Sequence, residues 1–479
     1  MPGILTLLHN AGGALDAFSR VLQVTQNNVA NASTPGYARQ REILYAMPFD
    51  PVSGAMGGVR AATVESTRDA YAEHSVRRET ASLGTAQQNV TSLSALESLF
   101  DISGDSGLPY ALNNLFQSFS AWAQSSTDAI ARQTVIERAG DVAAVFQQTA
   151  SGISRASTET VRQMREMVDQ VNGLTAKLAE YNQKAVEGGR NDAGLSAQIS
   201  TTLEDLSQYV DFTSVQQPDG SATVLLDGQI PLVIGGRQFA LSFDLRQSGD
   251  PPPTYPDAPP PARVLSGGAD ITNHVTGGRL AALLDVRNRV IPSYIGSASE
   301  AGDLNTMAKQ FADRVNQLLT GGCISSGTPP EAGIPLFTYD AGNDTAVAAT
   351  LAVNPAITAG QLAAIDPGPP SVANGIPLRL SALANPQSSE DQIDGASFTG
   401  FYGQMAARVG SELSAAQDQE SVQQSAVAQA KNLRQQISGV SLDEEAMILI
   451  EFQRAYQANS RMISVLDQLT EETINMLRG

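Results

Sequence analysis

The chain has few of the residues that staple small domains together or build large compact cores. Its 479 residues include one cysteine, Cys323, and one tryptophan, and only 5% are aromatic. A single cysteine excludes an internal disulfide. No nucleophile signature surrounds Cys323, so we expect it to be a small buried or incidental residue. The low aromatic content suits long helices with a narrow core better than one globule.

Basic residues are also in the minority. Asp and Glu number 49 against 30 Lys and Arg, which gives a formal net charge of −19. Nucleic-acid backbones are bound by clustered Lys and Arg, so we expect no nucleic-acid partner. We also expect no membrane partner, because no apolar run approaches the length of a membrane span.

Groups that could form a catalytic or metal site are scattered. The three histidines, His9, His74 and His274, lie far apart and lack partners at metal-ligand spacing. Segment 340–344 is faintly similar to a calcium loop, but the later glutamate is missing, and a surface loop explains it better. The paired glycines lack the frame of a phosphate-binding loop. The sequence therefore predicts no enzyme, no cofactor and no metal.

A cleavable signal peptide is not expected either. The first 19 residues contain no Lys or Arg, so the basic start of a secretory signal is missing. Together with the lack of disulfides, this predicts an intracellular protein, or one exported without disulfides by a route that hydropathy does not reveal.

The strongest positive pattern is a heptad stripe near the C-terminal end. Ser441 and Glu444 have the spacing of a capping box, which predicts a helix from Leu442 onward. Apolar residues then recur in steps of four and three, typical of a helix that packs on other helices. The stripe comprises Ile448, Phe452, Ala455, Asn459, Met462, Leu466, Leu469, Thr473 and Met476. A second row is Leu449, Tyr456, Ile463 and Leu477.

The N-terminal segment has the same periodicity. Its stripe comprises Ile4, Leu8, Ala11, Leu15, Phe18, Leu22, Thr25 and Val29. Leu7, Ala14 and Val21 form its second row. Two helices of an ordinary bundle would be the simpler interpretation. Their placement at the two ends favours a chain that folds back and pairs its termini.

Between the ends, helical and β-like patterns alternate. The chain is free of proline between Pro109 and Pro218, which permits long helices. Asp219-Gly220 lies between two strand-like runs and predicts a hairpin. We therefore predict a mainly α fold with an inserted β-rich domain. Its expected parts are a terminal coiled-coil core domain (1–60 with 438–479), a helical rod domain (61–205 with 277–320 and 398–437), a β-rich outer domain (206–276) and an irregular segment (321–397).

Motifs at both ends carry a family resemblance. Segment 27–37 reads NNVANASTPGY, segment 439–445 reads GVSLDEE, and segment 452–459 reads FQRAYQAN. These resemble the terminal signatures of bacterial flagellar rod, hook and hook-associated proteins. Arg39-Gln40 and the opening 442–445 are similar to the hook–filament junction members of that family. The resemblance covers 1–190, 278–318 and 398–479, and it leaves the middle segments unmatched.

The resemblance implies a structural component of the flagellar axis. Such proteins form a ring between hook and filament, and their terminal helices build the inner tube. The implied partners are copies of the chain itself, the hook protein, a second junction protein (hook-associated protein 3), a flagellar export chaperone and the type III export apparatus. The implied location is the extracellular flagellum, reached without a cleavable signal peptide.

The resemblance also assigns residues to an assembly interface. On the N-terminal side these are Ile4, Leu8, Leu15, Phe18, Leu22, Asn28, Asn31, Pro35, Gly36 and Tyr37. On the C-terminal side they are Ile448, Phe452, Tyr456, Asn459, Met462, Leu466 and Leu469. A chaperone would engage Ile448, Phe452, Ala455, Met462 and Leu466. Because a lone helix leaves its stripe uncovered, we expect the ends to become ordered when neighbouring subunits cover them.

Three other interpretations are compatible with the sequence. A sibling axial protein, the hook or the distal rod, shares the end motifs, although Arg39-Gln40 and the long helical middle argue against it. A free-standing coiled-coil adhesin or binding protein would form a stable oligomer on its own. An enzyme would need a catalytic set that we do not find.

Overall fold

A computed structural model of the chain describes residues 2–48, 57–102, 104–189, 192–246, 252–327 and 329–478. Side chains are described for these residues except 2–5 and 477–478. The chain is mainly helical with small antiparallel sheets, which confirms the predicted mainly α fold with a β-rich part. It divides into two compact units. Unit 1 comprises 1–83, 171–240 and 423–479, and unit 2 comprises 84–170 and 241–422.

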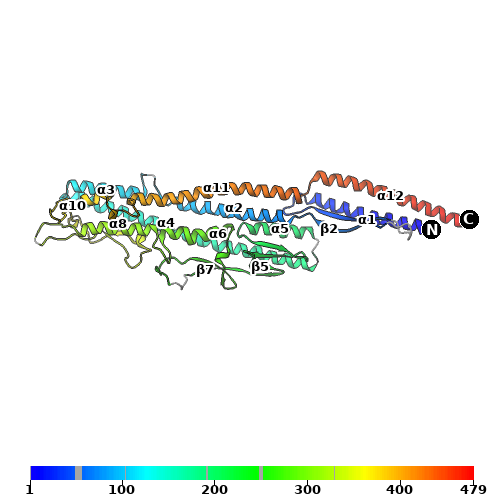
Figure 1. The fold of residues 1–479 in the computed structure, drawn as a ribbon, viewed down its shortest axis with the longest axis horizontal. Coiled ribbons are helices and arrows are strands. Elements are labelled where there is room, and N and C mark those ends of the chain that lie inside the picture. Colours follow the sequence, from blue (N-terminus) through cyan, green and yellow to red (C-terminus); the bar gives the residue numbers. More distant parts are fainter. Residues whose placement is uncertain are drawn as a thin grey trace. The chain divides into compact units, whose positions relative to one another are not determined.

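The two ends of the chain lie side by side in unit 1 (Figure 1). Helix α1 spans Pro2–Ala30 and helix α12 spans Leu442–Arg478. A hairpin of β1 (Gln40–Met47) and β2 (Gly58–Ser66) also packs on α1. The predicted pairing of N- and C-terminal helices is thus confirmed.

A four-stranded antiparallel sheet completes unit 1, together with α5 (Ala193–Ser207). Its strands, in spatial order, are β3 (Thr213–Gln216), β4 (Ala222–Leu226), β5 (Ile230–Ile234) and β6 (Arg237–Gln238). Asp219-Gly220 forms the predicted turn between β3 and β4, and Gly220 has a φ of 88°, which favours glycine. Asn182 anchors the sheet to α4 (Ala129–Lys184), since its amide donates to Ala222 O at 2.7 Å and Gly235 O at 2.9 Å.

Unit 2 is a helical body around one large apolar core. Phe311 lies near its centre, with its ring centroid 5.2 Å from that of Phe398 and 5.5 Å from that of Phe337. Its own helices are α3 (Gly107–Gln124), α6 (Gly278–Asp285), α7 (Ile291–Ile295), α8 (Asp303–Thr320), α9 (Val347–Thr350) and α10 (Gly375–Ala382). The unit boundary falls inside three helices, α2 (Ala70–Glu97), α4 and α11 (Phe398–Ser438).

The segment predicted to be one β-rich domain contains two separate sheets. The second sheet belongs to unit 2 and consists of β7 (Leu241–Leu245), β8 (Ala262–Ser266) and β9 (Ala269–Asp270). The unit boundary falls between residues 240 and 241, within the predicted domain 206–276. Alternation of apolar residues predicts strands but does not say which strands share a sheet. The four-domain division stays a prediction.

Segment 321–397, predicted to be irregular, contributes to the unit 2 core. Leu336, Leu351 and Leu362 are fully buried, and β10 (Phe337–Thr338) pairs with β11 (Ala352–Val353). Cys323 is buried, as expected. Short π or 3-10 turns lie at Ala185–Gly189, Thr272–His274, Val286–Val290, Ala359–Gln361 and Ser389–Asp391. Within the described ranges, none of the helices combines the length and apolarity that crossing a bilayer demands.

Candidate assembly interface

Helix α1 packs against α12 and against the hairpin of β1 and β2. Its buried residues are Asn28 near its end and a row of mainly small side chains, namely Ala11, Ala14, Ala17, Val21 and Thr25. Small side chains let α12 and the hairpin approach closely. One aromatic contact marks the pairing, because the rings of Phe18 and Phe452 meet edge to face with centroids 5.6 Å apart.

The predicted N-terminal interface residues are mostly half-buried. Leu8, Leu15, Phe18 and Leu22 are partly covered, whereas Pro35 at the turn is exposed. Ile4 lies outside the residues whose side chains are described. Contacts within the chain therefore cover part of the N-terminal stripe.

Within the chain, the first half of the predicted C-terminal stripe of α12 is covered, and a different row is covered in the second half. Ile448, Phe452, Ala455 and Asn459 are partly covered and Leu466 is buried. Tyr456, Met462 and Leu469 are exposed instead, at 39%, 53% and 47%. The covered positions after Asn459 are Ile463, Leu466, Thr470 and Thr473. The predicted row and the covered row both follow steps of three and four residues. The position of the partner helix therefore determines which row is covered.

Asn28 closes the junction between the two ends. It is 1% exposed, and its amide group donates to Gln40 O at 2.9 Å and to Glu445 Oε2 at 3.0 Å. Its Oδ1 accepts from Gln40 N at 2.9 Å and from the Tyr37 hydroxyl at 3.0 Å. Burial, and then the Glu445 carboxylate, raise the pKa of Tyr37, which keeps its hydroxyl protonated as a donor. The asparagine thus has both donors and its acceptor engaged.

The turn that follows α1 makes this closure possible. Gly36 has a φ of 71°, and a Cβ there would lie 2.6 Å from Ala197 O. A side chain would therefore be both strained and crowded at this position. The hydrogen bonds that the structure describes for Asn31 are all local. Its amide group donates to the backbone oxygen and to the side-chain oxygen of Asn27, each at 2.9 Å.

Arg39 forms ion pairs that link the two ends of the chain. From the sequence alone, this residue contributed only to the family resemblance. Its Nη1 lies 2.8 Å from Glu444 Oε2, and its Nε lies 2.7 Å from Glu445 Oε1. Its backbone N–H donates to Ser438 O at 2.9 Å. The acidic start of α12 therefore serves as more than a helix cap, because it binds the segment that follows the turn.

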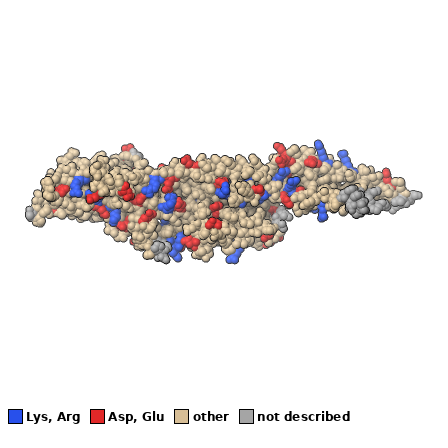
Figure 2. Space-filling view, in the orientation of Figure 1, with Lys and Arg blue, Asp and Glu red and all other residues tan. Residues whose placement is uncertain are grey.

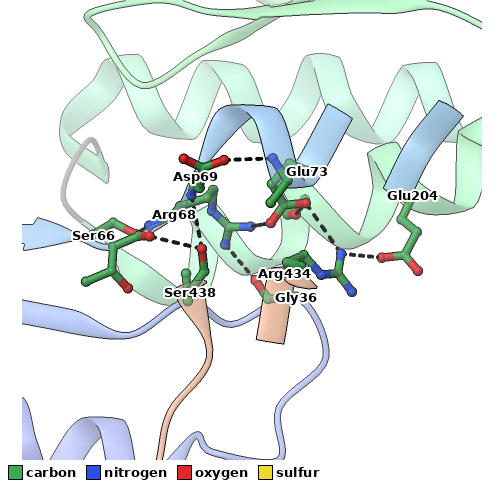
Figure 3. A network of polar contacts seen from close by, with 12 residues as sticks. Gly36, Ser66, Arg68, Asp69, Glu73, Glu204, Arg434 and Ser438 are labelled. Atoms are coloured by element: carbon green, nitrogen blue, oxygen red, sulfur yellow. Dashed lines mark hydrogen bonds and ion pairs between the residues drawn. The ribbon is translucent and has the colours of Figure 1, made fainter. Parts of the chain in front are cut away.

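A second polar network surrounds Glu73 at the start of α2 (Figure 3). Glu73 is 5% exposed and accepts from Arg68 Nη1 at 2.6 Å and from Ser200 Oγ at 3.1 Å. Arg434 Nη1 on α11 lies 2.7 Å from Glu204 Oε2 and 3.4 Å from Glu73 Oε2. Arg68 also donates to Gly36 O at 2.6 Å.

This Glu73 network joins four segments of unit 1: the turn after α1, the start of α2, α5 and the end of α11. Burial lowers the pKa of Arg68, and the Glu73 carboxylate opposes that change. Burial would raise the pKa of Glu204, but hydrogen bonds from Lys431 and Arg434 outweigh it and hold the pKa below 4.5. Sequence reasoning missed the network, because only the 73–77 spacing of a helical ion pair is visible locally.

Comparisons with known proteins agree with this arrangement of the ends. Residues 8–37 match the family model "Flagella basal body rod protein", and residues 434–476 match "Flagellar basal body rod FlgEFG protein C-terminal". These ranges contain most of α1 with its turn and most of α12. The paired ends thus define the class, which is that of structural components of the flagellar axis.

The middle of the chain narrows this class to one family. Residues 93–337, just over half of the chain, match the model "Flagellar hook-associated protein FlgK helical domain". The chain belongs to the flagellar hook-associated protein FlgK family. This confirms the resemblance seen in the terminal motifs. The family is one of structural flagellar proteins rather than a known enzyme family.

Individual relatives align along nearly the whole chain. The flagellar hook-associated protein 1 of Bacillus subtilis is 26% identical over 503 aligned positions, covering 98% of this chain and 97% of that protein. The Escherichia coli protein of that name is 22% identical, covering 98% and 100%. The solved structure of the flagellar hook junction protein FlgK from Burkholderia pseudomallei has a TM-score of 0.61 at 16% identity, covering 77% of this chain and 100% of that one. At such identity the structural likeness shows the fold alone.

Proposed function

We propose that the chain forms the junction between the hook and the filament of a flagellum, assembled through α1 and α12. Membership of the FlgK family carries this proposal. It is supported by the name "flagellar hook junction protein" of the structural neighbour. The neighbouring partners are then the hook protein on one side and hook-associated protein 3 on the other, with copies of the chain itself forming a ring.

The surface of α12 supports a role in assembly. Large apolar side chains stay exposed along it, namely Met447, Ile450, Met462, Val465 and Leu469, each 47–63% exposed. Apolar patches of this kind are typical of protein-protein contacts. The assembly interface is therefore formed by the predicted terminal residues together with this outer side of α12.

Export through the flagellar type III apparatus is the second part of the proposal. The proposed chaperone face, Ile448, Phe452, Ala455, Met462 and Leu466, includes residues that are partly covered or buried in the chain. Since Phe452 contacts Phe18 of α1, a chaperone on that face would exclude α1. The chaperone would therefore bind before the ends pair. Deleting residues 440–479 should abolish chaperone binding, and retained binding would contradict the assigned face.

The junction role is tested by deleting the gene in the source bacterium. We expect cells with complete hooks that lack filaments, and filament subunits released into the medium. Missing hooks would indicate a sibling rod or hook protein instead. Normal filaments with lost adhesion would indicate a free-standing adhesin. Electron microscopy of isolated flagella distinguishes these outcomes.

The purified full-length chain provides an independent test. A monomer whose first protease cuts fall in 2–30 and 442–478 supports ends that are completed by neighbouring subunits. A stable oligomer with protected ends would favour the coiled-coil binding protein.

A further inference from the structure

A cleft lies beside the paired terminal helices within unit 1. It has a volume of about 860 Å³ and is lined by residues of α1, β1, β2 and α12. Its apolar lining comprises Val21, Val24, Ile43, Leu44, Ile448 and Phe452. The volume lies within the range of about 300–1,000 Å³ that is typical of binding pockets.

Glu42 on β1 borders this cleft and a second hollow of about 580 Å³. It is only 8% exposed, and its Oε1 has no hydrogen-bond partner in the described part of the chain. Arg39, which also lines the cleft, is already paired with Glu444 and Glu445. An unpaired buried carboxylate oxygen is unfavourable. The single chain therefore leaves this acceptor unsatisfied.

The hairpin is irregular at the same place. Glu42 pairs with Val64 and Leu44 pairs with Ala61, so β2 has one extra residue opposite this stretch of β1. Bulges of this kind re-aim side chains and are common near functional sites. The irregularity lies directly beside the unsatisfied carboxylate.

Two basic groups on α12 are exposed and lack an acidic partner among the described residues. Arg454 and Arg461 are exposed, and neither forms an ion pair with any residue that the structure describes. Figure 2 shows basic side chains that project from the surface over α12. Exposed Ile450, Met462 and Val465 lie close to them in the helix sequence. This outer face of α12 therefore combines free guanidinium groups with apolar side chains.

The arginines of one copy cannot reach its own cleft. Arg454 lies two residues after Phe452 and Arg461 lies nine residues after it. At about 100° per residue, both project about 180–200° around the helix from Phe452, which lines the cleft. Neither helix arginine can therefore pair with Glu42 of its own chain, whereas the same arginines of a second copy are free to do so.

We propose that the cleft at Glu42 receives the outer face of α12 from a neighbouring copy, with Arg454 or Arg461 paired to the Glu42 carboxylate. This inference rests on the proposed assembly into a ring. The contact joins two different surfaces of the same chain, so it is head-to-tail and builds a ring or helix rather than a closed dimer. The apolar neighbours of the arginines would cover the apolar lining of the cleft.

Charge exchange tests the pairing in the source bacterium. Glu42→Arg and the double variant Arg454→Glu/Arg461→Glu should each lower the amount of chain retained in isolated flagella by about tenfold or more. Combining all three substitutions should restore most of it. No loss in the separate variants, or no recovery in the combined one, would overturn the inference. Absence of the wild-type chain from flagella would instead contradict the proposed function.

Glu42→Gln separates this role from a structural one. The amide keeps the shape of the side chain but cannot form the ion pair. We expect weaker retention in flagella while the melting temperature of the purified chain stays equal or rises, because the buried charge is gone. A lower melting temperature would show that Glu42 has an internal partner and would overturn the inference. Glu187→Gln, an exposed carboxylate on unit 1, is the matched control and should change neither measurement.

Discussion

Unit 2 and the paired terminal helices of unit 1 bury their apolar residues to different extents. In unit 2, Trp122, Phe119 and Phe311 are fully buried in a single apolar core. In the terminal pair, the buried apolar positions are mainly alanines, and Phe18 and Phe452 are only partly covered. Large apolar residues such as Met462 and Val465 stay exposed. Unit 2 thus completes its core alone, whereas the terminal pair has apolar surface left for other molecules.

The largest expected effect is therefore a truncation in the unit 2 core. Phe311→Ala should lower the free energy of unfolding of unit 2 by about 3–5 kcal/mol, because it opens a cavity among other rings. The lone Trp122 lies in the same core, so its fluorescence during urea unfolding reports this loss. Phe452→Ala, the matched truncation in the terminal pair, should cost only about 1–2 kcal/mol, because its ring is partly covered. Equal costs would contradict the comparison.

Breaking the Glu73 network should have the next largest effect, and it should be confined to unit 1. Glu73→Gln leaves Arg68 and Arg434 without their shared buried carboxylate, which we expect to cost about 3 kcal/mol. Hydrogen exchange should become faster at the start of α2, in α5 and at the end of α11, and stay unchanged around Phe311. Glu180→Gln on the exposed face of α4 is the control and should change nothing measurable. Faster exchange throughout unit 2 would contradict the separation of the two units.

Acid should weaken unit 1 through Glu204 by a smaller amount. The folded-state pKa of Glu204 lies below its ordinary value of 4.5. Protonation therefore opposes folding, so the stabilisation is complete above pH 4.5 and is lost as the pH falls through the folded-state pKa. The difference in unfolding free energy between wild type and Glu204→Gln should shrink over that window. A constant difference would show that the carboxylate charge is not the cause.

The smallest effect on stability should accompany a loss of assembly. Met462→Asp with Leu469→Asp changes exposed positions of α12, so the free energy of unfolding should stay within about 0.5 kcal/mol. Retention in isolated flagella should nevertheless fall, because the charged groups would be buried at the proposed contact. Thermal unfolding and immunoblotting of flagella measure the two quantities. Unchanged retention would exclude this face from the interface.

Local sequence features were sufficient to predict the helices at the ends of the chain and the class of protein. The heptad rows predicted α1 and α12 and their pairing, because helical periodicity depends only on neighbouring residues. The capping-box spacing of Ser441 and Glu444 correctly predicted a helix from Leu442. The terminal motifs predicted the family that the comparisons confirm.

The tertiary structure decided which of these residues meet. Met462 and Leu469 fit the predicted stripe, yet they are exposed, and Ile463 and Thr470 are partly covered in their place. The split of the β-rich segment into two sheets also depends on partners that alternation does not specify. The same holds for Asn28 with Glu445 and for Glu73 with Arg434, which lie hundreds of residues apart along the chain. Hydrogen bonds and ion pairs act over a few ångströms in space, so only the folded chain brings those partners together.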